Sequence, residues 1–397
     1  MTNSVFIQRV TLRHFKSIAA CEVELRPLSI IVGPNGSGKS NFVESLEFVR
    51  DALRESLDSA VRKRGGINEV RRRSGGHPTN MGIRLDFTLG NTTGFYAFEL
   101  HALSQAGYEV KREQCSIIAS ASVHEFNVEA GVVTHASTPT APAASKERLY
   151  LVNASGLKEF RPLYEALSSM GFYNLHAKAM RDLQDPDDGR LLRKDGRNLA
   201  SVIARLESAS AHDPTDVRKQ RIADYLHKVA SSVRDVKFRA VGPKHSLEFF
   251  QEVEGQKAPW RFWAASMSDG TMRALGVLTA VFQHDADVSV PLVAIEEPET
   301  ALHPAAADVL LGSLLEAAEN QQVLVTSHSA EILERDHDFS ECLIAVENIR
   351  GVTHIGPVSE EIKRLMRDHT FTPGELLRQG QLMPVLFSNT PQRELFS

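Results

Sequence analysis

The stretch that most constrains this chain is an apolar run at residues 28–32 followed by the sequence GPNGSGKS at 33–40. It matches G-x-x-x-x-G-K-[ST], in which glycines let the backbone curl so that successive N–H groups point at phosphate oxygens. Lys39 can reach the β- and γ-phosphates, and the Ser40 hydroxyl can ligate Mg²⁺. The sequence therefore predicts a site for a nucleoside triphosphate. The contact residues expected in this loop are Gly33, Asn35, Gly36, Ser37, Gly38, Lys39 and Ser40.

The segment after this loop has the periodicity of an amphipathic helix. Its apolar residues recur at steps of three or four, the spacing that one buried helix face requires. Such a helix directs its positive N-terminal end at the same anion as the loop. We expect it to run to about residue 57. The expected buried face consists of Phe42, Val43, Leu46, Val49, Leu53 and Leu57.

Length and composition exclude several other classes of protein. The chain has 397 residues, more than a single core usually holds, so we expect two or more subdomains. A formal charge of −5 gives no basic coat, so any contact with nucleic acid would need a local patch. Cys21, Cys115 and Cys342 are scattered and lack C-x-x-C spacing, which favours a reducing compartment and no zinc site. The start has no export signal and no apolar run approaches about 18 residues, so we expect a cytoplasmic protein that does not contact a membrane.

The first half of the chain has mostly the two-residue period of strands. Residues 5–12 and 21–25 are expected to form two antiparallel strands, and the same period returns in short runs between 81 and about 135, as in a meander. A polar, proline-bearing loop follows at 136–147.

Helical periodicity then dominates residues 158–232. Within it, Asp213-Pro214 is predicted to supply the N-cap and the first-turn proline of a helix that carries Ile222 and Leu226. Strand signals return at 235–240, 246–253 and 260–265.

The last third alternates strands with helices, which indicates a parallel α/β layer. We expect strands at 288–295 and 323–326, helices near 304–318 and 329–334, and a hairpin of strands 343–346 and 352–355.

Two carboxylates follow the apolar run that ends at Ile295. A P-loop enzyme needs one acidic group at this edge to hold Mg²⁺ through its water shell and another to orient or deprotonate the attacking water. Glu296 suits the first role and Glu297 the second. An acidic pair after a strand is by itself more often a solvated turn. The buried strand and the phosphate loop favour the functional interpretation here.

Two further polar motifs are weaker when taken alone. His328 ends the run Thr326-Ser327-His328 after an apolar strand, where it could reach a γ-phosphate or the attacking water. Ser268 and Gly270 lie at the start of a predicted helix, which makes a second anion-binding N-terminus or simply a capped helix.

Taken together and in this order, the motifs resemble those of the ABC-type ATPase superfamily. The phosphate loop with Asn41 after it, Ser268-Asp269-Gly270, the EEPE run at 296–299 with Leu302-His303-Pro304, and Thr326-Ser327-His328 are similar to the RecF/SMC-like and OLD-like branch. Phe15-Lys16-Ser17-Ile18 near the start and the run at 192–200 also fit that branch. The resemblance covers about residues 1–375.

This resemblance implies a fold, roles and partners. The fold would be an α/β P-loop NTPase of the ABC-ATPase type: a mixed β-sheet with an antiparallel β-subdomain and a short helical insertion. Residues 33–41 would bind ATP, Ser40 and Glu296 would hold Mg²⁺, and Glu297, His328 and Lys39 would be catalytic. Ser268 and Gly270 would contact the ATP of a second subunit, so that a head-to-tail homodimer, or a higher homo-oligomer, sandwiches two ATP molecules. The segment 301–303 would cross the dimer seam.

Two positions depart from the pattern of the superfamily. The magnesium carboxylate is Glu296 where aspartate is usual. The superfamily's glutamine is not evident, and either Asn174 or Gln114 is the candidate for its role. By segment, the resemblance implies an N-terminal ATPase lobe at 1–150, a helical lid at 151–234 and a C-terminal ATPase lobe at 235–397.

The biological role is open between two classes. One is a nucleotide-gated sensor or scaffold ATPase of a prokaryotic anti-phage defence system, which works with a separate effector such as a nuclease or toxin, because no effector chemistry is evident in this chain. The alternative is a DNA-stimulated, RecF-like ATPase of repair or recombination. Six cations in the region 62–73 are either a solvated loop with counter-charges or a contact for DNA or a partner. They are Arg62, Lys63, Arg64, Arg71, Arg72 and Arg73.

Overall fold

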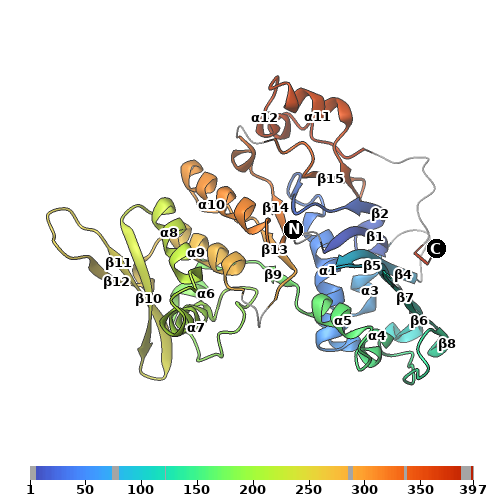
Figure 1. The fold of residues 1–397 in the computed structure, drawn as a ribbon. Coiled ribbons are helices and arrows are strands. Elements are labelled where there is room, and N and C mark those ends of the chain that lie inside the picture. Colours follow the sequence, from blue (N-terminus) through green and yellow to red (C-terminus); the bar gives the residue numbers. More distant parts are fainter. Residues whose placement is uncertain are drawn as a thin grey trace. The chain divides into compact units, whose positions relative to one another are not determined.

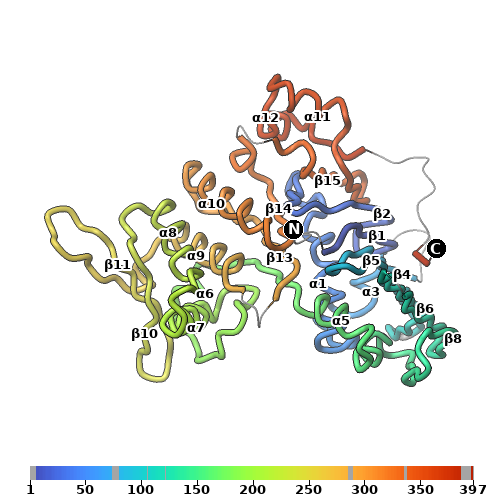
Figure 2. The backbone as a smooth tube through the Cα atoms, in the orientation of Figure 1, coloured from blue at the N-terminus to red at the C-terminus, as the bar shows by residue number. Residues whose placement is uncertain are grey.

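The structure is a computed structural model that describes residues 6–73, 80–120, 122–284, 289–334, 338–385 and 395–396. The chain forms two compact units: unit 1 comprises Met1–Met170 and His337–Ser397, and unit 2 comprises Gly171–Asp336 (Figure 1). Unit 1 thus brings the two ends of the chain, blue and red in Figure 2, into one body. These boundaries follow the packing of the chain, whereas the three predicted segments follow the order of its motifs.

Unit 1 is built on a mixed sheet with the strand order β8-β7-β6-β5-β4-β1-β2-β16-β15-β3. Its strands are β1 Ile7–Phe15, β2 Ile18–Glu24, β3 Leu28–Val32, β4 Asn80–Leu89, β5 Thr92–Ala102, β6 Tyr108–Ala119, β7 Ser122–Glu129, β8 Val132–Ala136, β15 Leu343–Ile349 and β16 Val352–Pro357. The run from β2 to β8 is antiparallel, which confirms the predicted pair and the predicted meander. The hairpin β15–β16 is also as predicted, and β15 pairs in parallel with β3.

The helices of unit 1 are mostly short. They are α1 Lys39–Arg54, α2 Leu57–Arg62, α3 Ile67–Val70, α4 Tyr150–Ala154, α5 Arg161–Ser168, α11 Glu360–Arg367 and α12 Pro373–Arg378. The predicted face of α1 is buried, but the helix stops at Arg54. The side chain of Ser56 accepts a hydrogen bond from the N–H of Ser59 and so caps a new helix, α2. Leu57 therefore begins α2 instead of ending α1.

Unit 2 combines a parallel sheet with helices and a separate antiparallel sheet. The parallel sheet has the order β14-β13-β9 and the antiparallel sheet the order β10-β11-β12. The strands are β9 Gly171–Tyr173, β10 Val233–Val241, β11 Lys244–Gln251, β12 Trp260–Trp263, β13 Leu292–Glu296 and β14 Gln322–Ser327. The helices are α6 Ala177–Arg181, α7 Leu199–His212, α8 Arg218–Val229, α9 Asp269–Phe282 and α10 Pro304–Ala317. Helix α8 packs on α9 and α10, and the antiparallel sheet packs on α7 and α8 (Figure 1).

Three helix predictions in this part of the chain are wrong. The expected helical run at 158–232 contains β9 and an irregular segment before α7. Asp213-Pro214 does not start α8, because the Asp213 carboxylate accepts the N–H and hydroxyl of Thr215 in a local turn and the helix begins at Arg218. The helix expected at 329–334 is only a 3-10 turn, Glu331–Leu333.

A buried carboxylate, Glu113 on β6, fixes the chain where it leaves the meander. It accepts hydrogen bonds from the hydroxyl of Tyr96 at 2.9 Å, from the N–H of Leu151 at 2.9 Å and from the N–H of Tyr150. These N–H groups belong to the first turn of α4, which has no partners for them within the helix. Glu113 is fully buried, and its burial raises the pKa of the carboxyl group to about 7.

This raised pKa predicts a loss of stability with rising pH. An unfolded glutamate titrates near 4.3, so between that pH and about 7 the folded state holds the proton more tightly. The free energy of unfolding is expected to fall across this window by about 4 kcal/mol and then to level off. The Glu113→Gln variant removes this titration. Urea unfolding at several pH values should therefore show that the free energy of unfolding of the variant, relative to that of the native protein, increases up to pH 7. If the difference in free energy of unfolding between the two proteins stays constant with pH, the raised pKa of Glu113 is contradicted.

Candidate functional site

The phosphate loop of unit 1 lies between β3 and α1, as the motif requires. All residues of β3 are buried, and Gly38 forms the N-cap of α1 at a φ of 106°, a conformation that favours glycine. A Cβ atom on Gly38 would lie 2.1 Å from Oγ1 of Thr353, and one on Gly33 would lie 2.2 Å from the carbonyl oxygen of Val346. The two glycines therefore let the loop curl closely against β15 and β16.

Polar contacts hold the loop from outside. Thr353 on β16 donates a hydrogen bond to the carbonyl oxygen of Ser37 at 2.9 Å, and its hydroxyl lies 2.7 Å from that of Ser17. Asn41 donates to the Ser17 hydroxyl at 2.6 Å, so its amide supports the loop from the side of the β1–β2 turn. Lys39 is buried and donates to the carbonyl oxygens of Gly33 at 2.8 Å and Pro34 at 3.0 Å. Its ammonium group is thus held against the curve of the loop.

The residues of this loop fit a bound triphosphate. The Ser37 hydroxyl oxygen is buried without a hydrogen-bond partner, and such a group is costly unless a ligand or solvent satisfies it. Among the described residues no group of three or more His, Cys, Asp or Glu side chains could hold a metal ion. Mg²⁺ usually takes only one or two protein oxygens and completes its shell with water and phosphate. The Ser40 hydroxyl and the Glu296 carboxylate are oxygen donors of the type it prefers.

The acidic pair of unit 2 lies at the carboxyl end of β13, beside two parallel strands. Glu296 pairs in register with Thr326 of β14, and the N–H of Glu297 donates to the Thr326 carbonyl oxygen at 2.9 Å. Glu297 has a φ of 46°, a left-handed conformation that is uncommon for a residue with a side chain. Such strain persists only where the surroundings hold the residue in place, and it is frequent at functional sites.

The structure brings two predicted catalytic residues into contact. Nδ1 of His328 lies 2.8 Å from Oε1 of Glu297, and both side chains remain more than one-third exposed. A carboxylate that is held by an imidazole and open to solvent can accept a proton from water. The order of the motifs in the sequence predicted both residues but not this contact.

Glu299 is a third carboxylate of this turn, and it is buried. It accepts a hydrogen bond from the hydroxyl of Ser327, whose oxygen in turn accepts the N–H of Ser329 at 3.0 Å. Burial raises the pKa of Glu299. The chain of contacts fixes the backbone on both sides of His328, so Glu299 is a positioning residue for the histidine.

The predicted signature residues lie at the start of α9. Ser268 is an exposed N-cap whose hydroxyl accepts the N–H of Thr271 at 3.1 Å, which confirms the predicted capped helix. A Cβ on Gly270 would lie 2.5 Å from the Ala301 carbonyl oxygen, so glycine allows α9 to pack closely on the segment 301–303. Arg181 holds the same helix end through the Met267 carbonyl oxygen, at 3.3 Å, and through an ion pair with Asp269.

Arg273 is a residue of this site that the sequence analysis missed. From the second turn of α9 it donates to the carbonyl oxygen of Glu297 at 2.9 Å and to that of Leu175 at 2.8 Å. Burial lowers the pKa of its guanidinium group. It therefore ties helix α9 to the turn that carries Glu297. The available signal was a charged residue inside an otherwise apolar helix.

The two candidates for the missing glutamine lie in different environments. Asn174 follows Tyr173, which pairs in register with Ile295, so Asn174 and Glu296 leave neighbouring strands at the same level. Gln114 lies in the middle of β6, within the meander of unit 1, with a buried amide oxygen that has no partner. The position of Asn174 favours it over Gln114 for this role.

The six cations of region 62–73 have partners within the chain. Arg64 is buried between Glu44 and Asp51, and Arg72 donates to the Ser17 carbonyl oxygen at 2.7 Å. The pairs of the others are Arg62 with Asp58, Lys63 with Glu55, Arg71 with Asn68 and Arg73 with Glu69. The structure therefore supplies carboxylate counter-charges for Arg62, Lys63, Arg64 and Arg73 and neutral oxygen acceptors for Arg71 and Arg72, which favours the simpler interpretation.

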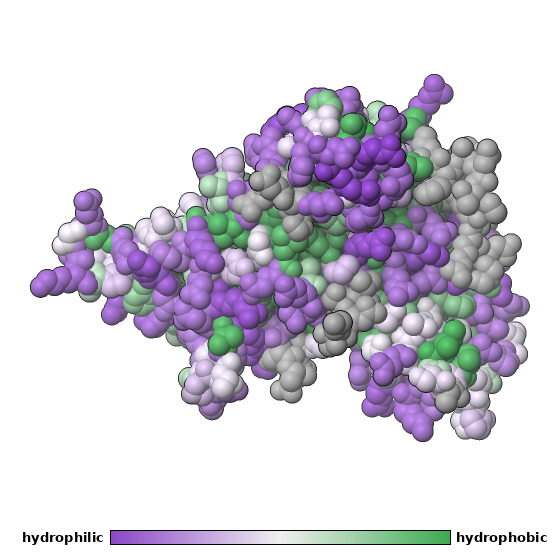
Figure 3. All heavy atoms as spheres, turned by 45° about the horizontal axis from the view of Figure 1, so that its top comes forward, coloured by the Kyte–Doolittle hydropathy of each residue, from purple (hydrophilic) through white to green (hydrophobic). Residues whose placement is uncertain are grey.

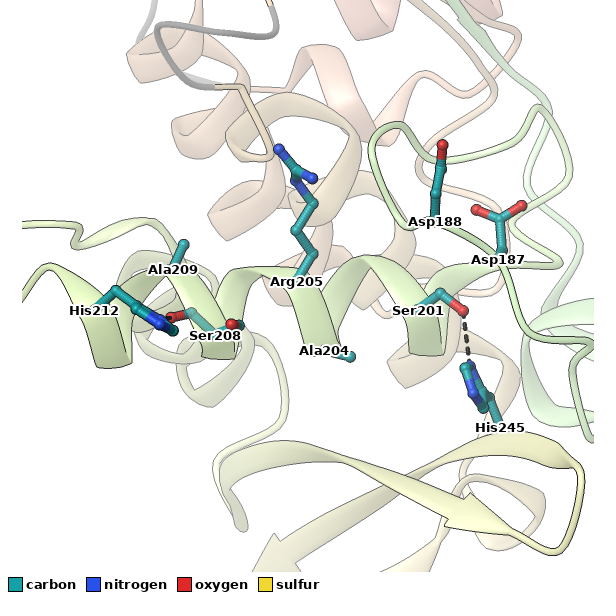
Figure 4. A pocket seen from close by; sticks show the side chains of 9 residues that line it. All are labelled: Asp187, Asp188, Ser201, Ala204, Arg205, Ser208, Ala209, His212 and His245. Atoms are coloured by element: carbon teal, nitrogen blue, oxygen red, sulfur yellow. Dashed lines mark hydrogen bonds between the residues drawn. The ribbon is translucent and has the colours of Figure 1, made fainter.

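Unit 2 also has an open pocket of about 480 Å³ beside one face of α7 (Figure 4). The hydroxyl of Ser201 lies 2.9 Å from Nδ1 of His245, and Asp187 lies close by. These residues are not arranged as a hydrolytic triad, because Asp187 already accepts from Gly189, Asn198 and Arg193. The Ser201–His245 bond instead connects α7 to β11.

None of the helices in the described parts is both long and apolar enough to cross a membrane. In Figure 3 hydrophilic residues cover most of the visible face, with smaller hydrophobic patches between them.

The fold and these motifs define the chain as a P-loop ATPase of the ABC type, in the RecF/SMC-like branch. Residues 28–334 match the family model described as "AAA domain, putative AbiEii toxin, Type IV TA system", and the chain belongs to this family.

Relatives and solved structures agree with this class. The chain is 24% identical over 292 residues to the chromosome partition protein Smc of Desulfitobacterium hafniense (strain Y51). The match covers 69% of the chain but only 23% of that relative. The fold is similar to an SmcHead bound to the C-winged helix domain of ScpA, with a TM-score of 0.56, 13% identity and coverage of 90% of this chain and 99% of that one. It is also similar to an Smc head domain with an extended coiled coil bound to the C-terminal domain of ScpA, derived from Pyrococcus furiosus, with a TM-score of 0.55, 11% identity and coverage of 92% and 100%.

Proposed function

We propose that this protein binds and hydrolyses ATP, and that ATP joins two copies of the chain. The observation that carries the proposal is the contact between Glu297 and His328 on a strained turn. In this scheme the loop 33–40 binds the phosphates, and Ser40 and Glu296 hold Mg²⁺. The metal supplies charge neutralisation of the phosphates when bound.

Glu297 would accept a proton from the attacking water, and His328 would orient that carboxylate. The lysine ammonium of Lys39 would offset the charge that develops on the transferred phosphoryl group. Ser268 and Gly270 would contact the ATP held by the second copy, a role that the exposure of Ser268 supports. Arg273 would connect that contact to the position of Glu297.

For the biological role we propose a nucleotide-gated sensor or scaffold in a prokaryotic anti-phage defence system, with a separate effector protein. The family description names a putative toxin of a type IV toxin–antitoxin system, which supports a role in a system that acts through toxicity. The similar Smc heads are bound to parts of ScpA, which supports a separate protein partner for a head of this type. DNA-stimulated hydrolysis in repair is the second candidate, favoured by the Smc relative.

The test of the enzymatic proposal is phosphate release from ATP with Mg²⁺. The native protein is expected to release phosphate, and Lys39→Ala to lose activity by about 100-fold or more because the buried ammonium group is removed. Lys63→Ala is the matched control, since Lys63 pairs with Glu55 away from the loop. Equal rates for Lys39→Ala and the native protein would contradict the proposal.

A further inference from the structure

The antiparallel sheet of unit 2 has one buried face and one open face. Val236, Phe249 and Phe262 pair across the three strands. Val236 and Phe249 are fully buried, on the side that packs against α7 and α8. The next positions along the strands point the other way. The register therefore places Lys237, Phe250, Arg261 and Trp263 on the open face, together with the carboxylates of Asp235 and of Glu248, the latter buried.

Both tryptophans of the chain lie on the short edge strand of this sheet. The sequence has two, Trp260 and Trp263, and they are 50% and 47% exposed. Strand β12 pairs with β11 on one side and is last in the strand order of its sheet. Covering an aromatic side chain removes a large apolar surface from water, which is favourable. Two half-exposed tryptophans at an open edge therefore indicate a contact surface.

Two cations lie beside the Phe250 ring on the open face. The Lys237 ammonium group lies 5.2 Å and the Arg261 guanidinium carbon 5.7 Å from the ring centre of Phe250. Lys237 is paired with Asp235 at 3.8 Å, and Arg239, two positions along, is paired with Glu248 at 2.8 Å. Arg261 is exposed and has no ion pair with any carboxylate of the described residues. A ring flanked by cations, with one cation unpaired, complements a negatively charged ligand that has flat apolar groups.

We propose that the open face of β10–β12 binds single-stranded nucleic acid. Unpaired bases would stack on Trp263 and Phe250, and the phosphates would contact Arg261 and Lys237. A duplex is less suitable, because its bases already stack on each other and their faces are hidden. The proposal does not depend on ATP hydrolysis and involves none of the residues assigned to it.

The position of the tryptophans gives a direct test. Because no other tryptophan is present, intrinsic tryptophan fluorescence reports on strand β12 alone, with Trp263 on the open face and Trp260 on the other. Titration with a 20-nucleotide oligo(dT) at low salt is expected to quench it. Trp260→Phe, which leaves Trp263 as the emitter, should keep most of the quenching, and Trp263→Phe should lose most of it. An unchanged emission on titration of the native protein would overturn the proposal.

Affinity measured by anisotropy of a labelled oligo(dT) separates stacking from charge. Trp263→Ala is expected to weaken binding between about 5-fold and about 100-fold, the range for loss of one stacked base. Arg261→Ala should weaken binding and reduce the salt slope by about one. Arg234→Ala is the control, because Arg234 lies on β10 but pairs with Glu252 and His227. Circular dichroism should show all variants folded, since the substituted side chains are exposed.

Three results would overturn the proposal. The first is an equal loss of affinity in Arg234→Ala and Arg261→Ala. The second is tighter binding to a 20-base-pair duplex than to oligo(dT). The third is a concentration-dependent self-association that Trp263→Ala abolishes, which would assign the surface to a second copy of the chain.

Discussion

Replacing Glu297 with glutamine is expected to stop ATP turnover while ATP stays bound, and so to hold two copies of the chain together. The amide cannot accept a proton from the attacking water, and loss of such a base costs about 100-fold to 10,000-fold in rate. The substitution preserves side-chain size, and the amide oxygen can still contact Nδ1 of His328. The left-handed backbone at residue 297 is equally strained with either residue. Only the chemical step is therefore removed.

The measurement is mass by light scattering after size exclusion, with and without ATP and Mg²⁺. With ATP the variant should elute at twice the mass of the chain, and the native protein should return to its starting mass as ATP is consumed. Glu319→Gln, an exposed carboxylate in the same unit, is the control and should behave as the native protein. If ATP leaves the mass of Glu297→Gln unchanged, the proposed ATP-joined dimer is wrong.

The parts of this molecule that could be predicted are those encoded by neighbouring residues. The strand, loop and helix at 28–54 depend on local period and on glycines, and the structure has them where expected except that the helix ends at Arg54 instead of about residue 57. The capped start of α9 is equally local, because Ser268 bonds Thr271 three residues away. The two-residue period of the strands likewise predicted the antiparallel meander.

Errors arose where short-range polar contacts or distant partners decide the conformation. A sequence pattern cannot separate an Asp-Pro helix start from a turn in which Asp213 binds Thr215, since both use the same carboxylate. Ser56 divides the first helix in a similar way. Arg273 was missed for another reason: its acceptors are backbone carbonyl oxygens at Leu175 and Glu297, and every residue type has that group. Only the folded chain shows that it joins α9 to the turn that carries Glu297.

Mixing two inactive variants is expected to restore ATP hydrolysis if each site is shared between two subunits. Lys39→Ala damages the phosphate loop of a subunit, and Ser268→Arg places a large cation at its exposed signature. In a mixed dimer, the intact loop of the second variant faces the intact signature of the first, so one complete site forms. Random exchange makes about half of the dimers mixed, which predicts recovery of about a quarter of the native rate if the two sites of a symmetric dimer act independently.

The control for this mixture is Ser266→Arg, which places the same cation two residues before the signature at another exposed position. It should be active alone, so loss of activity in Ser268→Arg would reflect the position and not the added charge. Loss of the N-cap costs about 1 kcal/mol, too little to unfold the unit. A mixture no more active than the separate variants, with Ser268→Arg fully active alone, would mean that each chain hydrolyses ATP without a partner. Recovery, in contrast, requires that the loop and the signature acting on one ATP come from different chains, because neither variant contains an intact pair.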